Sequence, residues 1–299
     1  MIDPVAIAPG TDCLTLKLPM LAHFLGITIA TSGIILFTLL PFLPGRYDAL
    51  AVRLSLMSQI FGKVGLLLMP VGALWVVSGY WSRLAGKQHG IATAALIASS
   101  VVWAIVSLGA LVPSGFLLGL GAVVLWIYVV SRVLPRLKRL KIAAPRPTSA
   151  VAFYLLIVPV AVTLLQMAML APAIEFSRDR AIRNSAQLIA DIEQYRAAHG
   201  RYPASLLSVW EDYLPGVIGI KEYHYEPSGD AYNLFFEQFA LQFGTREFVM
   251  YNPRDQQAFT SHKLDLLQLT PQQLALEQTR GHYAVHDAPH PHWKYFWFD

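Results

Sequence analysis

Long apolar runs separated by short polar connections dominate the N-terminal part of the chain. A helix needs about 20 predominantly apolar residues to cross the hydrocarbon core of a bilayer. We predict that five runs meet this length and form transmembrane helices: Leu21–Leu43, Ser58–Tyr80, Ile91–Leu111, Gly115–Val133 and Val151–Pro172. This pattern is typical of a membrane region built from helices.

A different pattern follows Pro172, where polar and charged residues become frequent. Apolar residues recur every three or four positions in Ser177–His199, which is the period of a helix with one apolar face. The stripe consists of Ile182, Ala186, Ile189, Ile192 and Tyr195. Gly200 is the residue type that commonly ends a helix, and Pro203 blocks its continuation. We expect a second short helix at Ser205–Tyr213.

The pattern then changes to that of β-strands. Two runs, Glu222–Glu226 and Ala231–Gln238, flank the turn sequence Pro227–Asp230, which predicts a β-hairpin. A further strand is expected at Glu247–Tyr251. The aromatic run Tyr295–Phe298 is expected to close the sheet.

These patterns divide the chain into two domains. We assign residues 1–174 to a five-helix transmembrane region. Residues 175–299 form an α+β domain with a small antiparallel sheet, and a capping box predicts a short helix within it at Thr270–Thr279. The composition agrees, because only 14% of the residues are charged and the mean hydropathy is +0.46. In soluble domains, about a quarter of the residues are charged.

Charge is distributed unevenly between the two parts. The residues before Glu175 include twelve Lys or Arg and three Asp or Glu, a net charge of +9. The residues from Glu175 onward include eleven Lys or Arg and sixteen Asp or Glu, a net charge of −5. The two parts together give the net charge of +4 of the whole chain. The basic residues therefore belong to loops beside a membrane, and we do not expect nucleic acid as a partner.

One basic loop indicates the orientation of the chain. Its six residues are Arg132, Arg136, Lys138, Arg139, Lys141 and Arg146. Cytoplasmic loops carry an excess of Lys and Arg, so we place this loop in the cytoplasm, facing membrane lipids. Counting spans from it places the N-terminus in the cytoplasm and everything after Pro172 in the periplasm of a bacterium. Arg46 and Arg53 fall on the outer side, against this rule.

An apolar helix with an amphipathic extension leads into the segment Tyr195–Pro203, which reads YRAAHGRYP. This arrangement resembles the type II secretion major pseudopilin family. The matching residues are Tyr195, Arg196, Gly200, Tyr202, Pro203 and Leu206. The resemblance covers about Ala161–Leu234 and implies a pilin-like domain, in which a long helix precedes a small antiparallel sheet. Because this helix is the fifth span, we interpret the protein as a pilin-like domain on a polytopic membrane anchor.

Histidines near the C-terminus form the one candidate metal site. They are His282, His286, His290 and His292, with Asp287 beside them. Imidazole suits zinc and copper, but a polar chain end without a metal has the same composition. The single cysteine, Cys13, excludes a cysteine cluster within the chain. A second basic group, Arg178, Arg180 and Arg183, would meet a ligand phosphate, lipid head groups or acids of its own domain.

The sequence contains no Ser/His/Asp set, Gly-rich phosphate loop or Walker pattern. We therefore expect a non-enzymatic protein of the bacterial inner membrane, without a cofactor. It would present a periplasmic pilin-like domain to a protein partner in the cell envelope. The alternative is a membrane enzyme or metal-handling protein that uses the histidines near the C-terminus.

Overall fold

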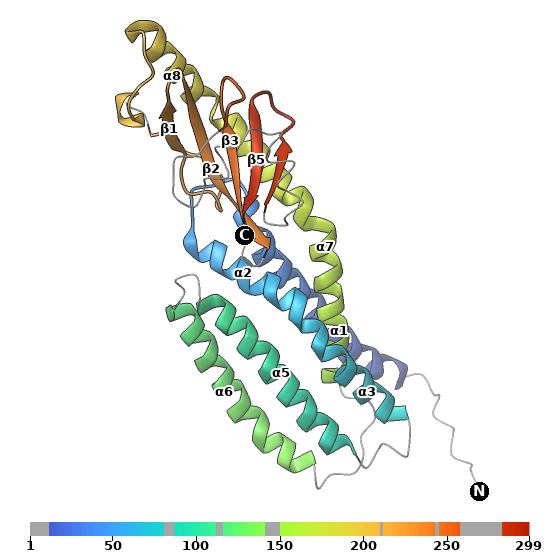
Figure 1. Ribbon diagram of the computed structural model, residues 1–299. Coiled ribbons are helices and arrows are strands. Elements are labelled where there is room, and N and C mark those ends of the chain that lie inside the picture. Colours follow the sequence, from blue (N-terminus) through green and yellow to red (C-terminus); the bar gives the residue numbers. More distant parts are fainter. Residues whose placement is uncertain are drawn as a thin grey trace, which may run out of the picture. The chain divides into compact units, whose positions relative to one another are not determined.

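The computed structural model describes residues 12–80, 87–111, 116–140, 150–209, 212–242, 245–257 and 283–298 (Figure 1). The chain forms two compact units. The helical unit comprises Met1–Leu36 and Met57–Gln166, and the sheet unit comprises Phe37–Leu56 and Met167–Asp299. The sequence predicts a boundary between residues 174 and 175, whereas in the structure the segment Phe37–Leu56 belongs with the C-terminal part.

Most of the chain is helical, as the sequence predicts. The long helices are α1 (Asp12–Leu39), α2 (Ala49–Val64), α3 (Met69–Tyr80), α5 (Gln88–Leu111), α6 (Phe116–Leu140), α7 (Ala150–Asn184) and α8 (Ala186–His199). Short 3₁₀ segments are η1 (Leu40–Phe42), η2 (Gly65–Leu68) and η3 (Leu206–Ser208). Pro70 follows η2 and has no N–H for a helical bond, which accounts for the change of helix type between α2 and α3.

Four helical stretches of the described chain are long and apolar enough to cross a membrane. They are Leu21–Phe42, Ala49–Ser78, His89–Leu108 and Ala150–His199. The fourth predicted span corresponds to α6, in which the stretch Gly119–Pro135 is an apolar helix. The several apolar helices are compatible with a membrane protein, and the count of five spans stays a prediction.

Buried polar groups in the helical unit bond to the backbone of neighbouring helices. Gln166, a central polar residue of its span, donates from Nε2 to the Ser58 carbonyl at 2.8 Å. The indole N–H of Trp103 in α5 donates to the Ala122 carbonyl in α6 at 2.8 Å. The Trp103 ring stacks on Trp126 with 5.7 Å between centroids. These bonds satisfy groups that the apolar surroundings would otherwise leave without partners.

A small antiparallel sheet forms the centre of the sheet unit (Figure 1). Its strands are β1 (His224–Ser228), β2 (Ala231–Gln242), β3 (Thr245–Tyr251), β4 (Tyr283–Asp287) and β5 (Trp293–Phe298), in the order β1-β2-β3-β5-β4. The predicted hairpin is confirmed as β1 and β2, which pair through Ser228 and Ala231. Strand β4 is not predicted from the sequence. The predicted helix Thr270–Thr279 lies outside the described residues.

One face of the sheet packs on the C-terminal part of α7 and on α8. The fully buried side chains of this core are Ala181, Leu188, Ile192, Tyr232, Leu234, Phe236 and Val249. The predicted apolar stripe needs correction, because Leu188 is buried whereas Ala186 is exposed and Ile189 is only half-buried. α7 and α8 meet at Ser185, which is itself buried, so the buried face runs through Ile182, Ser185, Leu188 and Ile192.

The connector between α1 and α2 is bonded into the sheet unit. We call this arrangement the clasp: residues 41–48 lie beside residues 216–219. Its backbone bonds run from Gly45 N to Gly216 O at 3.0 Å, from Asp48 N to Ile218 O at 3.0 Å, from Ile218 N to Leu43 O at 3.1 Å and from Gly219 N to Pro41 O at 2.7 Å. A Cβ on Gly219 would lie 2.8 Å from the Pro41 carbonyl oxygen, so this close approach requires glycine.

Candidate functional sites

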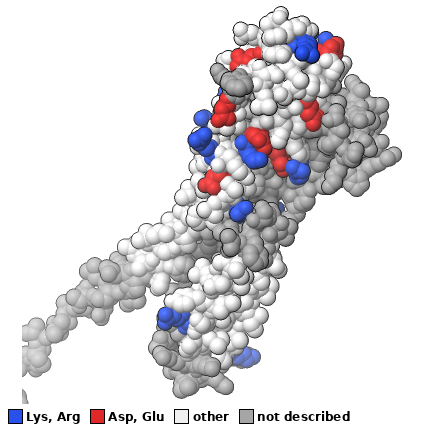
Figure 2. Space-filling view, turned by 90° about the vertical axis from the view of Figure 1, so that its left-hand side faces the viewer, with Lys and Arg blue, Asp and Glu red and all other residues white. Residues whose placement is uncertain are grey.

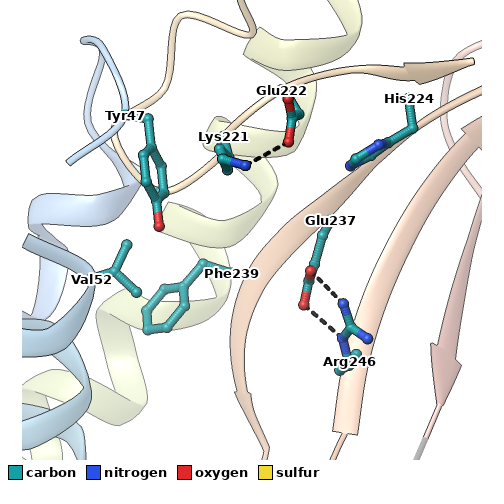
Figure 3. A pocket seen from close by; sticks show the side chains of 9 residues that line it. Tyr47, Val52, Lys221, Glu222, His224, Glu237, Phe239 and Arg246 are labelled. Carbon is teal, nitrogen blue, oxygen red and sulfur yellow. Dashed lines mark hydrogen bonds and ion pairs between the residues drawn. The ribbon is translucent and has the colours of Figure 1, made fainter. Parts of the chain in front are cut away.

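A pocket of mixed charge lies in the sheet unit, and we call it the mixed-charge pocket (Figure 3). Its volume is about 400 Å³, which is within the range of small-molecule sites. The lining residues are Tyr47, Val52, Gly219, Lys221, Glu222, His224, Glu237, Phe239 and Arg246. They come from the connector, the start of α2, the loop before β1, and strands β1, β2 and β3. Because these parts are separated along the sequence, no sequence motif predicts the pocket.

Two ion pairs supply the charges of this pocket. Lys221 Nζ lies 2.8 Å from Glu222 Oε1, and the Arg246 guanidinium donates to both carboxylate oxygens of Glu237 at 2.8 and 2.7 Å. The hydrogen bond from Lys221 lowers the pKa of Glu222. The hydrogen bond to Glu237 raises the pKa of Arg246. The pocket therefore contains two basic and two acidic side chains, each basic one bonded to an acidic one.

A second hollow, the apolar groove, lies in the same unit and has a volume of about 320 Å³. It is lined by Leu39, Phe42, Leu43, Ala168, Met169, Pro172, Ala173 and Phe176. These residues come from the end of α1, from η1 and from α7. The ring of Phe42 packs against Phe239 of the mixed-charge pocket with 5.7 Å between centroids. The two hollows thus meet at one pair of aromatic rings.

The described histidines of the candidate metal site have separate partners. His290 Nε2 lies 3.1 Å from Asp179 Oδ1 on α7, and His292 Nδ1 lies 3.1 Å from Asp255 Oδ2. His286 stacks on Tyr295 with 4.9 Å between ring centroids. No group of three His, Cys, Asp or Glu residues within the described ranges could hold a metal ion. His282 lies outside the described residues, so a site that includes it stays a prediction.

The residues of the pilin-like motif lie around the end of α8. Gly200 follows the helix in a left-handed conformation with φ of 70°, and its N–H donates to the Arg196 carbonyl at 2.8 Å. Tyr195 stacks on His199 in the last turn. Pro203 is buried, and its carbonyl accepts a 2.8 Å bond from the Tyr225 hydroxyl. Leu206 begins η3 and packs against the core.

Tyr202 of this motif uses its hydroxyl in two hydrogen bonds. The hydroxyl accepts a bond from Arg196 Nη1 at 2.7 Å and donates to Glu193 Oε1 at 3.3 Å. The ring is half-buried against Tyr232, with 4.9 Å between centroids. Burial, together with the Glu193 carboxylate, raises the pKa of Tyr202. The expected second helix after this turn is only the three-residue segment η3 in the described residues.

Tyrosines form a buried cluster beneath this turn. Tyr232 contacts Tyr202, Tyr225 and Tyr251, with ring centroids 4.9, 5.5 and 5.8 Å away. Burial raises the pKa of Tyr232 and of Tyr225 well above the usual tyrosine range. Tyr223, at the other side of the core, also has a raised pKa because of burial. These groups stay protonated at physiological pH and act as packing groups.

A buried ion pair joins α7 to β3. Arg178 Nη2 lies 2.6 Å from Glu247 Oε1, and the two side chains are only 9% and 2% exposed. Trp297 Nε1 donates to the other carboxylate oxygen at 2.8 Å, and the guanidinium lies 4.1 Å from the centroid of the Tyr295 ring. Arg178 therefore meets an acid of its own domain, which is one of the alternatives that the sequence leaves open.

The predicted cytoplasmic basic loop is described in part. Arg132 lies in α6, with its guanidinium 5.2 Å from the centroid of the Tyr128 ring. Arg136, Lys138 and Arg139 belong to the last turns of the same helix. Lys141 and Arg146 lie outside the described residues. The side of the membrane on which these residues lie stays a prediction.

Comparison with models of known protein families, with curated proteins and with solved structures finds no match. The resemblance to pseudopilins therefore depends on the motif residues alone.

Proposed function

We propose that the protein is a non-enzymatic component of a bacterial inner membrane. It presents a pilin-like domain on the periplasmic side to a protein of the cell envelope. The sheet unit is the contact module in this proposal, and the apolar helices serve as its anchor. The resemblance of the turn after α8 to pseudopilins is the reason for proposing an envelope partner.

The clasp is the observation that best supports the proposal. The sheet unit contains the connector between the first two apolar helices and the C-terminal part of α7 as elements of its own fold. The neighbouring loop residues Pro215 and Gly216 are also bonded to α7, where Arg180 Nε donates to the Gly216 carbonyl at 3.0 Å and Asn184 Nδ2 to the Pro215 carbonyl at 2.6 Å. The sheet unit thus contains segments that continue along the chain into apolar helices, as an anchored module requires.

The turn after α8 offers a place to look for the partner. Leu207 lies in η3 and is 80% exposed, the largest exposed fraction among the large apolar side chains of the described chain. A photoreactive residue at the neighbouring exposed position Ala204, in the full-length protein in living bacteria, should crosslink to one protein that mass spectrometry identifies. Leu207→Asp should abolish the crosslink, because apolar anchors dominate the free energy of protein contacts.

A probe at Leu125 is the matched control, since this side chain is 55% exposed but belongs to α6 in the helical unit. It should give lipid adducts and not the protein found from Ala204. The same set of proteins from both probes, or none from Ala204, would contradict the proposal. A reporter fused after Asp299 that is active only in the cytoplasm would contradict the orientation. Stoichiometric zinc or copper that is lost in His282→Ala would favour the alternative, a metal-handling protein.

A further inference from the structure

The mixed-charge pocket lies next to residues that flank membrane-spanning candidates. Tyr47 belongs to the connector between the candidate spans Leu21–Phe42 and Ala49–Ser78, and Val52 lies in the first turn of the second of these spans. A connector between two membrane spans lies at the level where a bilayer gives way to water. Head groups of phospholipids occupy that level, so they are the solutes present there at the highest concentration.

The charges of the pocket favour a ligand that carries both signs. Both ion pairs are largely exposed, with side-chain exposures of 68% and 50% for Lys221 and Glu222 and of 60% and 47% for Arg246 and Glu237. Exposed pairs contribute little to stability, so a ligand can insert its own charges between the partners at small cost. A phosphate would then face Lys221 and Arg246, and a primary ammonium would donate to the carboxylates of Glu222 and Glu237. A purely anionic ligand would leave both carboxylates opposed by like charge.

The apolar groove fits the remaining part of such a ligand. Its residues belong to the end of the candidate span Leu21–Phe42 and to the middle of the stretch Ala150–His199, and their apolar side chains favour an acyl chain over water. The groove and the pocket are neighbours, because Phe42 of the groove packs on Phe239 of the pocket, and the Gly219 N–H bonds to the Pro41 carbonyl at 2.7 Å. Neighbouring hollows of these two kinds fit one molecule with a charged head and an apolar chain.

We propose that the sheet unit binds one phospholipid with a phosphoethanolamine head group, seated in the mixed-charge pocket, and one acyl chain in the apolar groove. This inference concerns the outer end of the apolar helices and is independent of the protein partner proposed above. It also differs from the basic loop after α6, which offers only positive charge to lipids.

The test uses the full-length protein in nanodiscs that contain equal amounts of phosphatidylethanolamine, phosphatidylcholine and phosphatidylglycerol. Native mass spectrometry of the released protein should show phosphatidylethanolamine retained over the other two by on the order of tenfold. Ala173→Trp fills the groove and should remove this preference. Ala171→Trp is the matched control, because Ala171 is exposed on the same helix, does not line the groove and should leave the preference unchanged.

The head-group arm of the test replaces Lys221 and Arg246 together by Met, which should also remove the preference while leaving total lipid retention unchanged. Soluble glycerophosphoethanolamine should not displace the lipid, because it has no chain for the groove. Equal retention of the three lipids, a preference for phosphatidylglycerol, or equal behaviour of the two Trp variants would overturn the proposal. If Ala173→Trp fails to fold, judged by its thermal transition, Ala173→Leu and Ala171→Leu take the places of the two Trp variants.

Discussion

The two units of the protein differ in which side chains they expose and which they bury. The helical unit exposes large apolar side chains, among them Ile97, Leu108, Leu125, Ile127 and Leu164, each more than half exposed. The described residues of this unit include no buried charged side chain. The sheet unit instead buries an Arg–Glu pair and carries most of the charged surface visible in Figure 2.

The difference shows which solvent each unit is built for. Exposed leucine and isoleucine side chains are favourable against lipid and costly against water, whereas charged surface has the opposite preference. The interactions that stabilise the interiors of the two units also differ. Packing and backbone bonds stabilise the helical unit, while the sheet unit also depends on a buried ion pair and on protonated tyrosines. Conditions that change protonation should therefore affect the sheet unit alone.

Alkaline pH should produce the largest difference in stability between the two units. The pKa values of the buried Tyr223 and Tyr232 are raised, so their contribution to stability is fully present below the unfolded-state pKa of about 10 and is lost as the pH rises above it. Each such group should lower the free energy of unfolding by about 1.4 kcal/mol per pH unit in that range. Near-ultraviolet circular dichroism between about pH 8 and about pH 12 measures the loss of tyrosine packing.

The control for this titration is Tyr223→Phe, which should make the fall in stability less steep because one ionising group is removed. Far-ultraviolet circular dichroism should meanwhile retain the signal of the apolar helices. A sheet unit that keeps its tyrosine signal unchanged to about pH 12 would show that the raised pKa values are not linked to folding.

Removing Arg178 should have the next largest effect. Arg178→Met leaves the Glu247 carboxylate buried without its cation, which should cost about 3–5 kcal/mol of unfolding free energy in the sheet unit. Arg183→Met is the matched control, because the pair of Arg183 with Asp179 is 58% and 38% exposed and should contribute less than about 1 kcal/mol. Denaturant unfolding followed by tryptophan fluorescence measures both.

The double variant Arg178→Met/Glu247→Met sharpens this result. Because the pair is replaced by apolar side chains, most of the lost stability should return. If the double variant is as unstable as the single one, the pair acts through its bond to Trp297 and not through charge.

Truncating one isoleucine in each unit compares their interiors directly. Ile192 is fully buried on α8, and Ile192→Ala should cost about 2–5 kcal/mol. Ile127 on α6 is 62% exposed, and Ile127→Ala should change stability by less than about 0.5 kcal/mol. Thermal unfolding of both variants in the same detergent measures the difference. Equal losses would mean that Ile127 is buried by a partner in solution.

The smallest effect is expected at the turn after α8. Tyr202→Phe removes the hydroxyl bonds to Arg196 and Glu193 but keeps the ring on Tyr232, so it should cost about 0.5–1.5 kcal/mol. Tyr195→Phe is the control, since its ring can still stack on His199. Thermal unfolding of the two variants should show the larger shift for Tyr202→Phe. No shift for Tyr202→Phe would show that the two hydroxyl bonds do not contribute to stability.

Much of the local structure could be predicted because it depends on neighbours in the sequence. The hairpin of β1 and β2 follows from the turn at Pro227–Asp230 between two strand-like runs. The candidate sites could not be predicted in the same way. The mixed-charge pocket combines the connector with three strands, and the histidines near the C-terminus turn toward separate acids although they are close in sequence.

The sequence by itself determined the apolar helices, the end of α8 at Gly200 and the positions of four of the five strands of the described chain, because each depends on periodicity, on turn residues or on the conformational freedom of one glycine. Only the tertiary structure decided the burial of Leu188 in place of Ala186, the pairing of Arg178 with Glu247 and the clasp of residues 41–48 with residues 216–219. These contacts join segments far apart in the chain or depend on which face of a helix the sheet covers. Side-chain volume, charge partners and backbone bonds select them only when the chain has folded.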